Sequence, residues 1–192
     1  MSLDSLYSFV FRGLLTEEAL DTAGREKRLQ NDIDHEETSQ LVAINALDEE
    51  LVAAARHMSI AYTAICAFEN SVRKLIEKTL LEEVGEDWWM SSVSEKVRKS
   101  AKSRIENEEK IRWHGQRGSD PIFYTMLPDL LKIIRQNHQH FEASIANVDW
   151  AAQVFDGIER SRNVIMHSGD LSTRDLARVG SLIRDWNAQV GI

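Results

Sequence analysis

The feature that most constrains the fold is the stretch of residues 48–84, in which nothing interrupts a helix. It contains neither proline nor glycine, and Gly85 is the first residue able to stop it. At the rise of an α-helix this stretch is roughly 55 Å long. Its apolar residues recur at helical spacing. They are Leu51, Met58, Ile65, Phe68, Val72, Leu75, Ile76 and Leu80. We expect this helix to be the central element of the fold.

The rest of the chain also favours helices. Only two prolines and nine glycines occur in 192 residues, and no segment has the pattern of a strand. We expect helices over residues 4–34, 93–112 and 128–141, another from Asn147 or Asp149 to Gly169, and a last one from Ser172 past Trp186. Ser92 and Ser172, each followed three residues later by an acid, are expected N-caps. The sequence therefore predicts an all-α fold, with residues 31–38 as a polar linker.

Composition indicates a globular protein of a reducing compartment. Apolar residues make up 43% of the chain and charged residues 28%. The single cysteine, Cys66, excludes an intrachain disulfide, and we expect it to be a small core residue. The run without charge at residues 58–68 is shorter than the about 20 residues that cross a bilayer. No basic segment followed by an apolar one begins the chain. We expect a cytoplasmic protein without a membrane segment.

The charge is unevenly distributed. The chain carries a formal net charge of −8, whereas residues 95–117 contain eight Lys or Arg against four Asp or Glu. A protein that coats nucleic acid without specificity is usually basic, so any contact of this chain with nucleic acid must be local. The basic stretch is either a solvated helix face or an RNA-contacting one.

Several classes of chemistry are disfavoured because the sequence lacks the motifs that they require. The sequence has no nucleophile elbow, no phosphate-binding loop and no glycine-rich dinucleotide turn. His138 and His140 are two residues apart, so on a helix their rings point away from each other, and no cysteine pair or zinc-binding helix pattern accompanies them. The acidic residues around His35 lack the spacing of metal ligands. We expect neither a metal nor a cofactor.

Residues able to hold a phosphate and move a proton gather at residues 159–169. Arg162 offers a planar fork of donors that suits phosphate, and His167 can act as acid or base near neutral pH. The two lie about 140° apart around a helix, whereas Asn163 lies on the same face as His167. With RNA, the ribose 2′-OH can itself attack the adjacent phosphate, so a site needs only proton transfer and charge stabilisation.

This spacing alone leaves a purely structural alternative open. Arg162 could form a surface pair with Glu159, and the His167 ring could bond the last carbonyls of the helix. Arg135 and His140 have the same separation as Arg162 and His167, which shows that such spacing also arises by accident.

A longer pattern resembles the HEPN superfamily. Residues 162–172 read RNVIMHSGDLS and are similar to its arginine-asparagine-x3-histidine motif. Residues 67–73 (AFENSVR), 85–89 (GEDWW) and 133–137 (IIRQN) resemble the HEPN branch found at the C-terminus of a nuclear RNA quality-control endoribonuclease and in many bacterial proteins. The combination of the double tryptophan, Trp88 and Trp89, with the motif is specific.

The resemblance covers residues 48–192 and implies an HEPN-like helical bundle with residues 1–47 as an N-terminal helical extension. It implies a metal-independent endoribonuclease with Arg162 and His167 as the catalytic pair, Asn163 as the polar second position, and Glu69 or Asn70 facing the motif. Such chains commonly pair so that both motifs line one cleft, which implies a homodimer. RNA is the implied substrate, in settings such as phage defence or toxin–antitoxin systems, where an antitoxin or regulatory protein is a further partner. A non-catalytic module that binds RNA, a nucleotide or a protein is the alternative.

Overall fold

The computed structural model describes residues 12–13, 16, 35–111 and 113–191, and within these ranges every regular element is a helix. The expected all-α class is thus confirmed for the described part of the chain. The chain divides into two compact units, residues 1–52 and residues 53–192. The helix expected over residues 4–34 lies outside the described residues, apart from Arg12, Gly13 and Thr16.

In the first unit, the polar stretch expected to be a linker is partly helical. Helix α2 (His35–Leu41) includes its last four residues, so the prediction of a linker was wrong from His35 onward. A single 3₁₀ turn, η1 (Ile44–Ala46), follows after Ala43, which has a positive φ of 53°. The carboxylate of Asp48 then accepts hydrogen bonds from the N–H groups of Glu50 and Leu51 at the start of the next helix.

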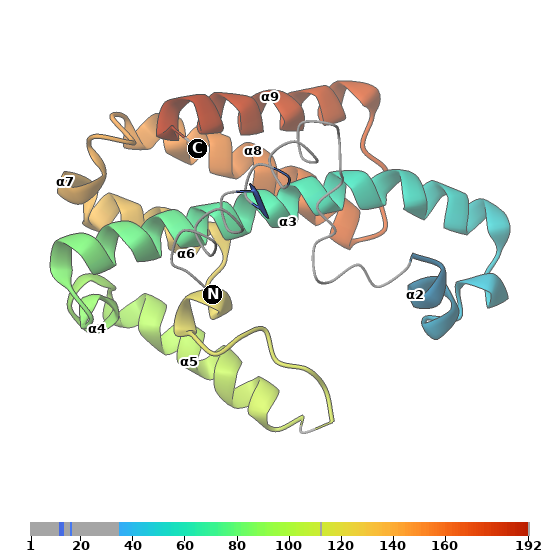
Figure 1. Ribbon diagram of the computed structural model, residues 1–192, viewed down its shortest axis with the longest axis horizontal. Coiled ribbons are helices and arrows are strands. Elements are labelled where there is room, and N and C mark those ends of the chain that lie inside the picture. Colours follow the sequence, from blue (N-terminus) through green and yellow to red (C-terminus); the bar gives the residue numbers. More distant parts are fainter. Residues whose placement is uncertain (1–11, 14–15, 17–34, 112, 192) are drawn as a thin grey trace. The chain divides into compact units, whose positions relative to one another are not determined.

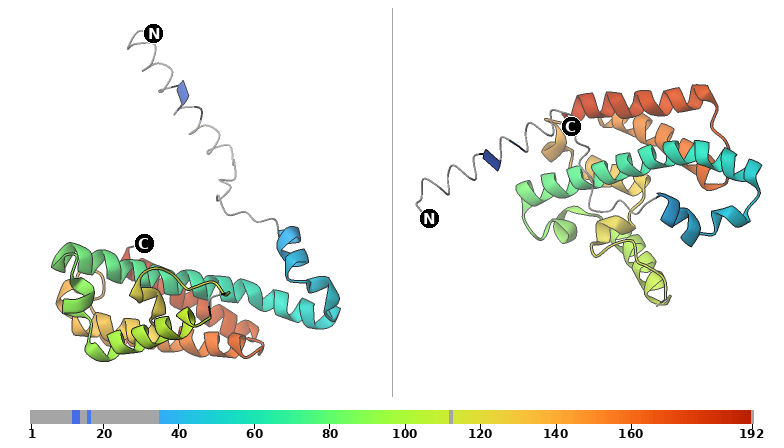
Figure 2. Two further views of the ribbon diagram at one scale, coloured as in Figure 1. Left: turned by 90° about the horizontal axis from the view of Figure 1, so that it is seen from below. Right: turned by 45° about the vertical axis from the view of Figure 1, so that its right-hand side comes forward.

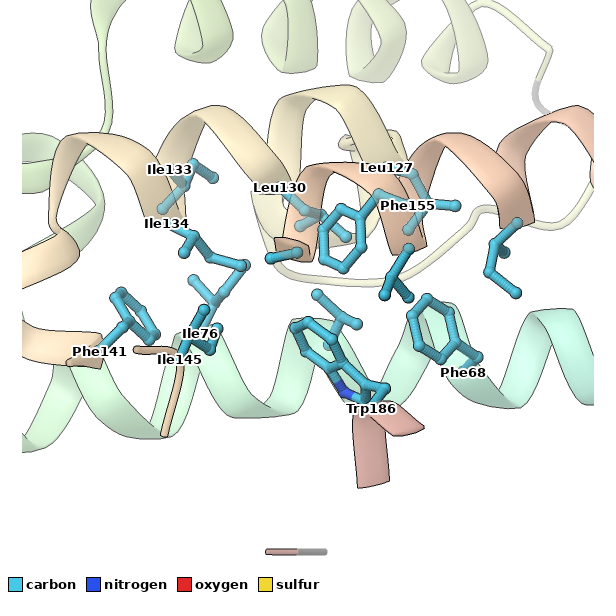
Figure 3. Close-up of a cluster of buried hydrophobic side chains, with 14 of the residues drawn as sticks. Phe68, Ile76, Leu127, Leu130, Ile133, Ile134, Phe141, Ile145, Phe155 and Trp186 are labelled. Carbon is cyan, nitrogen blue, oxygen red and sulfur yellow. The ribbon is translucent and has the colours of Figure 1, made fainter. Parts of the chain in front are cut away.

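The central helix is present as expected. Helix α3 (Glu49–Val84) ends where Gly85 adopts a φ of 95°. Its buried stripe meets the side chains of helices α6 (Leu127–Gln136), α8 (Val148–Met166) and α9 (Thr173–Val190) in the main core (Figure 3). Phe68 lies edge-on to Phe155 of α8 and Trp186 of α9, with ring centroids 5.9 and 5.7 Å apart. Helices α8 and α9 lie side by side along α3 (Figures 1 and 2).

The other helices complete this unit. They are α4 (Trp88–Ser92), α5 (Glu95–Glu109), a 3₁₀ turn η2 (Pro121–Tyr124) and α7 (His138–Phe141). Trp88 joins the core and Trp89 packs against it, with their rings 5.6 Å apart and nearly perpendicular. The double tryptophan therefore closes one end of the core.

Two expected helix boundaries were wrong. Ser92 is the last residue of α4 and caps nothing; Ser94 takes the N-cap position of α5. The helix expected to run to residue 141 breaks at Asn137, whose buried amide donates to the carbonyls of Ser92 and Ile133. This long-range hydrogen bond satisfies the Ser92 carbonyl and stops α6. By contrast, Asn147 and Ser172 cap α8 and α9 as expected.

By length and composition, α3 is the one described helix that could cross a membrane, since residues 51–68 carry a single formal charge, Arg56. This is a weak indication, because the core helix of a soluble protein passes the same test. Ile65 and Phe68, in the same stretch, are buried against the other helices.

Adjacent leucines of α3 test the core. Leu80 is fully buried and Leu81 is 47% exposed. We expect Leu80→Ala to lower the free energy of unfolding by about 2–5 kcal/mol, because it leaves a cavity, and Leu81→Ala to change it by only about 0.5 kcal/mol. Urea denaturation followed by circular dichroism measures both. Equal effects of the two substitutions would contradict the packing described for α3.

Candidate active site

The motif lies where α8 ends, and the helix is closed by a two-bond cap. Met166 is the last helical residue, and Ser168 adopts a left-handed φ of 59°. The N–H of Ser168 donates to the carbonyl of Ile165 at 3.0 Å, and that of Gly169 to Val164 at 2.8 Å. This pair of bonds is a Schellman motif.

The helix was expected to end at Gly169, where a glycine can adopt a left-handed φ, but the left-handed residue is Ser168. A Cβ on Gly169 would lie 2.9 Å from Val164 Cγ1 and 3.0 Å from the Val164 carbonyl oxygen. Glycine is needed there so that the chain can fold back closely against the last turn of α8.

Arg162 lies between two carboxylates from different helices. Its Nε is 3.7 Å from Glu69 Oε2 on α3, and its Nη1 is 3.8 Å from Glu159 Oε1 on α8. The side chain is 23% exposed. The pair with Glu159 that the spacing allowed is present, but Glu69 makes it part of a larger cluster. Both distances are ion-pair distances and exceed hydrogen-bond length, and the guanidinium makes no hydrogen bond within the described residues. Its N–H donors therefore remain available.

Glu69 is the buried centre of this cluster, 7% exposed. Its Oε1 accepts a hydrogen bond from Arg73 at 2.9 Å, a pairing that a four-residue spacing on a helix allows. Arg73 also donates to the carbonyl of Thr125 at 3.0 Å and to the exposed Asn70 at 2.8 Å. Of the two residues expected to face the motif, Glu69 faces Arg162 and Asn70 instead binds Arg73. We refer to Glu69, Arg73, Glu159 and Arg162 as the charge cluster.

His167 and Asn163 stand apart from the charge cluster. Both side chains are exposed, and neither makes a hydrogen bond or ion pair with any residue that the structure describes. The backbone N–H of His167, rather than its ring, donates to the carbonyls of Asn163 and Val164. The structure therefore contradicts the alternative in which the His167 ring caps the helix. One copy of the chain positions Arg162 and leaves the imidazole free in solvent.

The pKa of the Glu159 carboxyl is raised above its usual value. Burial is the main cause, the nearby charge of Arg162 opposes it, and Glu69 adds to it. Its Oε2 is buried and has no hydrogen-bond partner within the described residues. Burial therefore makes ionisation of the Glu159 carboxyl less favourable in the folded protein than in water.

Two side chains of α3 adjoin this cluster and were not expected in the site. The pKa of the exposed Tyr62 phenol is raised, chiefly by a hydrogen bond with Cys66, while Arg162 lowers it. Cys66 is half-buried rather than a core residue. Tyr62, Cys66 and Glu69 are spaced four and three residues apart, which places them on one helix face. This spacing was the sequence signal that could have placed Tyr62 and Cys66 near the site.

Two other histidines have structural contacts. His138 Nε2 lies 2.9 Å from the carbonyl oxygen of Ile145, and His140 lies 3.5 Å from a carboxylate oxygen of Glu83. Arg135 pairs with Asp149 at the surface, so the second arginine–histidine pair has no buried acid beside it. Among the described residues, no group of three or more His, Cys, Asp or Glu side chains could hold a metal ion.

The raised pKa of Glu159 gives a pH-dependent prediction. Below the ordinary value of 4.5 this carboxyl is protonated in both the folded and unfolded chain. As the pH rises, the unfolded chain loses the proton first, so this group lowers stability towards neutral pH. We expect Glu159→Gln to raise the melting temperature at pH 7 and to leave it unchanged near pH 4.

Glu106→Gln is the matched control for this experiment. Glu106 lies 3.8 Å from Lys102, as Glu159 does from Arg162, but on an exposed helix face. We expect little effect of that substitution at either pH. If Glu159→Gln lowered the melting temperature at pH 7, attraction to Arg162 would outweigh burial.

Comparisons of the chain with protein-family models, with curated proteins and with solved structures find no match. What the site can do follows from its own side chains: a half-buried guanidinium held by carboxylates, with free donors, beside a helix end that carries an exposed imidazole.

Proposed function

We propose that this protein is a metal-independent endoribonuclease of the HEPN type. Arg162 holds the scissile phosphate and His167 moves the proton. Glu69 orients Arg162, Asn70 acts only through its bond with Arg73, and Asn163 is the polar position on the helix face of His167. The observation that carries the proposal is the state of Arg162. Its guanidinium is fixed by the charge of Glu69 yet makes no hydrogen bond within the described residues. Paired N–H donors that are positioned and unused suit a phosphate that gains charge in the transition state.

The chemistry needs no group beyond these side chains and the substrate. The ribose 2′-oxygen attacks the adjacent phosphorus as the imidazole takes its proton. The bond from phosphorus to the 5′-oxygen breaks, and that oxygen takes a proton from an imidazolium or from water. The products are a 2′,3′-cyclic phosphate and a free 5′-hydroxyl. Arg162 stabilises the negative charge that builds up on the phosphate oxygens between these steps.

A second copy of the chain supplies what one copy lacks in this proposal. Exposed apolar side chains occur within the motif itself, Val164 and Met166 on α8. Met58 and Ala61 of α3 pack with Leu171, so this part of α3 and the chain after the motif share a small core. Paired across a two-fold axis, two such surfaces would bury apolar area and bring His167 of each chain towards Arg162 of the other.

The alternative of a non-catalytic module that binds RNA, a nucleotide or a protein also has one observation in its favour. The exposed His167 ring makes no hydrogen bond or ion pair with the charge cluster within the described part of a single chain. A surface that only binds would need Arg162 and would not need the imidazole in reach of it.

Cleavage of RNA in the presence of EDTA tests the catalytic proposal. We expect single-stranded RNA to give products that end in 2′,3′-cyclic phosphate. Arg162→Ala and His167→Ala are each expected to slow cleavage by about 10²–10⁴-fold, as loss of charge stabilisation or of a proton-transfer group does. Arg135→Ala and His140→Ala are the matched controls with the same residue types and spacing, and they should keep full activity. Loss of activity on chelation, or a fully active His167→Ala variant, would contradict the mechanism.

Mixing inactive variants tests the shared cleft. If Arg162 of one chain works with His167 of the other, a dimer of one Arg162→Ala chain and one His167→Ala chain contains one intact site. An equal mixture should then recover about a quarter of wild-type activity, since half the dimers are mixed and each has one site of two. A cleft formed within one chain would give no recovery. Met166→Glu, at an exposed apolar residue of the motif, should reduce both dimer mass in light scattering and activity.

A further inference from the structure

A tyrosine of the central helix lies beside the candidate site, and the proposed mechanism does not use it. Tyr62 is 42% exposed, although its neighbour in sequence, Ala61, is buried. Tyr62, Cys66 and Glu69 are spaced four and three residues apart, so they share one face of α3. On that face Glu69 forms its ion pair with Arg162. An exposed aromatic ring is therefore carried by the same helix face as the acid that positions Arg162.

The packing of α3 against α8 places this tyrosine level with the motif. Phe68 of α3 meets Phe155 of α8, whereas Ile165, further along α8, packs against the small core that includes Ala61. Helix α8 therefore runs antiparallel to α3 (Figure 1). Tyr62, the residue after Ala61, lies level with the last turn of α8. That turn connects the arginine of the motif to its histidine, so a nucleotide bound there would lie beside the tyrosine.

The electrostatic surroundings of the Tyr62 phenol agree with this position. Its hydroxyl is hydrogen-bonded with Cys66, one turn further along α3, and this bond is the main reason why the pKa of Tyr62 is raised. The positive charge of Arg162 lowers that pKa and the negative charge of Glu69 raises it, so the phenol lies within electrostatic reach of both groups. Because the hydroxyl already has a partner, the ring is the part of Tyr62 that is left to meet a ligand.

The charges of the site cannot by themselves hold a polyanion. With both carboxylates ionised, the two acids and two arginines of the charge cluster have no net charge, and the whole chain has a net charge of −8. Arg162 can bind one phosphate through its unused donors, but ionic attraction beyond that contact is weak. A strand bound here must therefore gain affinity from a contact that does not depend on net charge. Stacking of a base on an aromatic ring is such a contact.

We propose that the ring of Tyr62 stacks on the base of a nucleotide next to the phosphate that Arg162 holds. The inference rests on the proposed endoribonuclease function, which supplies the strand. It defines the substrate class as unpaired RNA, because a base in a duplex is stacked on its neighbours and is not free to turn onto a side chain. Stacking accepts every base, so this contact gives little sequence preference. Tyr62 acts in binding and takes no part in proton transfer.

Binding of two non-cleavable strands tests this proposal. One probe is a fluorescein-labelled 2′-O-methyl oligoadenylate of about 12 nucleotides, which lacks the attacking hydroxyl. The other is the same sugar–phosphate chain without bases. We expect Tyr62→Ala to weaken binding of the first strand by about 5- to 150-fold in fluorescence anisotropy, and to leave binding of the abasic strand unchanged. Arg162→Ala should weaken binding of both strands, because each carries the phosphates.

Three further variants and measurements serve as controls. Tyr62→Phe keeps the ring and should retain most of the binding. Ile60→Ala is the matched control, since Ile60 is 74% exposed and lies about 200° around α3 from Tyr62. It should bind both strands as the wild type does. In cleavage assays Tyr62→Ala should raise KM and leave kcat nearly unchanged, with an unchanged melting temperature, whereas a purely structural role of the side chain would lower the melting temperature.

The outcomes separate this proposal from the proposed function. Equal affinity of wild type and Tyr62→Ala for the base-bearing strand, or no measurable binding of that strand by the wild type, would overturn the stacking contact. So would an equal loss of both strands, or a loss in Tyr62→Phe as large as in Tyr62→Ala. The nuclease would still stand after any of these results if RNA is cleaved in EDTA and cleavage depends on Arg162. Weakened binding of the base-bearing strand alone, with no cleavage of any RNA, would support the stacking contact and contradict the nuclease.

Discussion

The structure depends on one continuous stripe of α3. Ile65, Phe68, Val72, Ile76 and Leu80 recur every three or four residues and are almost completely buried. Because the helix has no internal break, these side chains form one rigid row against which α6, α8 and α9 all pack (Figure 3). The same row fixes where α8 lies, and therefore where its C-terminal end and Arg162 lie. For this reason, the packing of α3 also determines the position of the candidate site.

Glu69 puts a charge into this buried row, next to Phe68. A carboxylate that is 7% exposed is costly unless opposite charges and hydrogen bonds surround it. Arg73 supplies a hydrogen bond from the same helix, and Arg162 supplies a second positive charge from α8. Arg73 also holds the Thr125 carbonyl just before α6. The need to neutralise Glu69 therefore links α3, α8 and the segment that precedes α6. It also holds the Arg162 guanidinium in place by an ion pair, without using its N–H donors in a hydrogen bond.

Much of the fold was predictable, because its signals are local. Gly85 ends α3, Asn147 and Ser172 cap their helices, and helical spacing marks the stripe of α3. One error originates in a contact between residues far apart in sequence, and another in a close approach at the end of a single helix. Asn137 stops α6 because it reaches Ser92, 45 residues away, and no local pattern reveals this. Ser168 rather than Gly169 is left-handed because Gly169 must approach Val164 closely.

In the candidate site, too, local spacing was visible in the sequence, whereas the contact with another helix was not. Spacing alone could not separate Arg162 and His167 from Arg135 and His140, since both pairs are five residues apart. The surroundings differ: Arg135 meets the exposed carboxylate of Asp149, whereas Arg162 meets the buried carboxylate of Glu69 on another helix. An exposed pair is screened and mobile, so it neither fixes a guanidinium nor strengthens its field. A buried acid 93 positions away does both, and this distinguishes Arg162 from Arg135. The arginine–histidine spacing does not reveal Glu69, and only the resemblance named it, as one of two candidates.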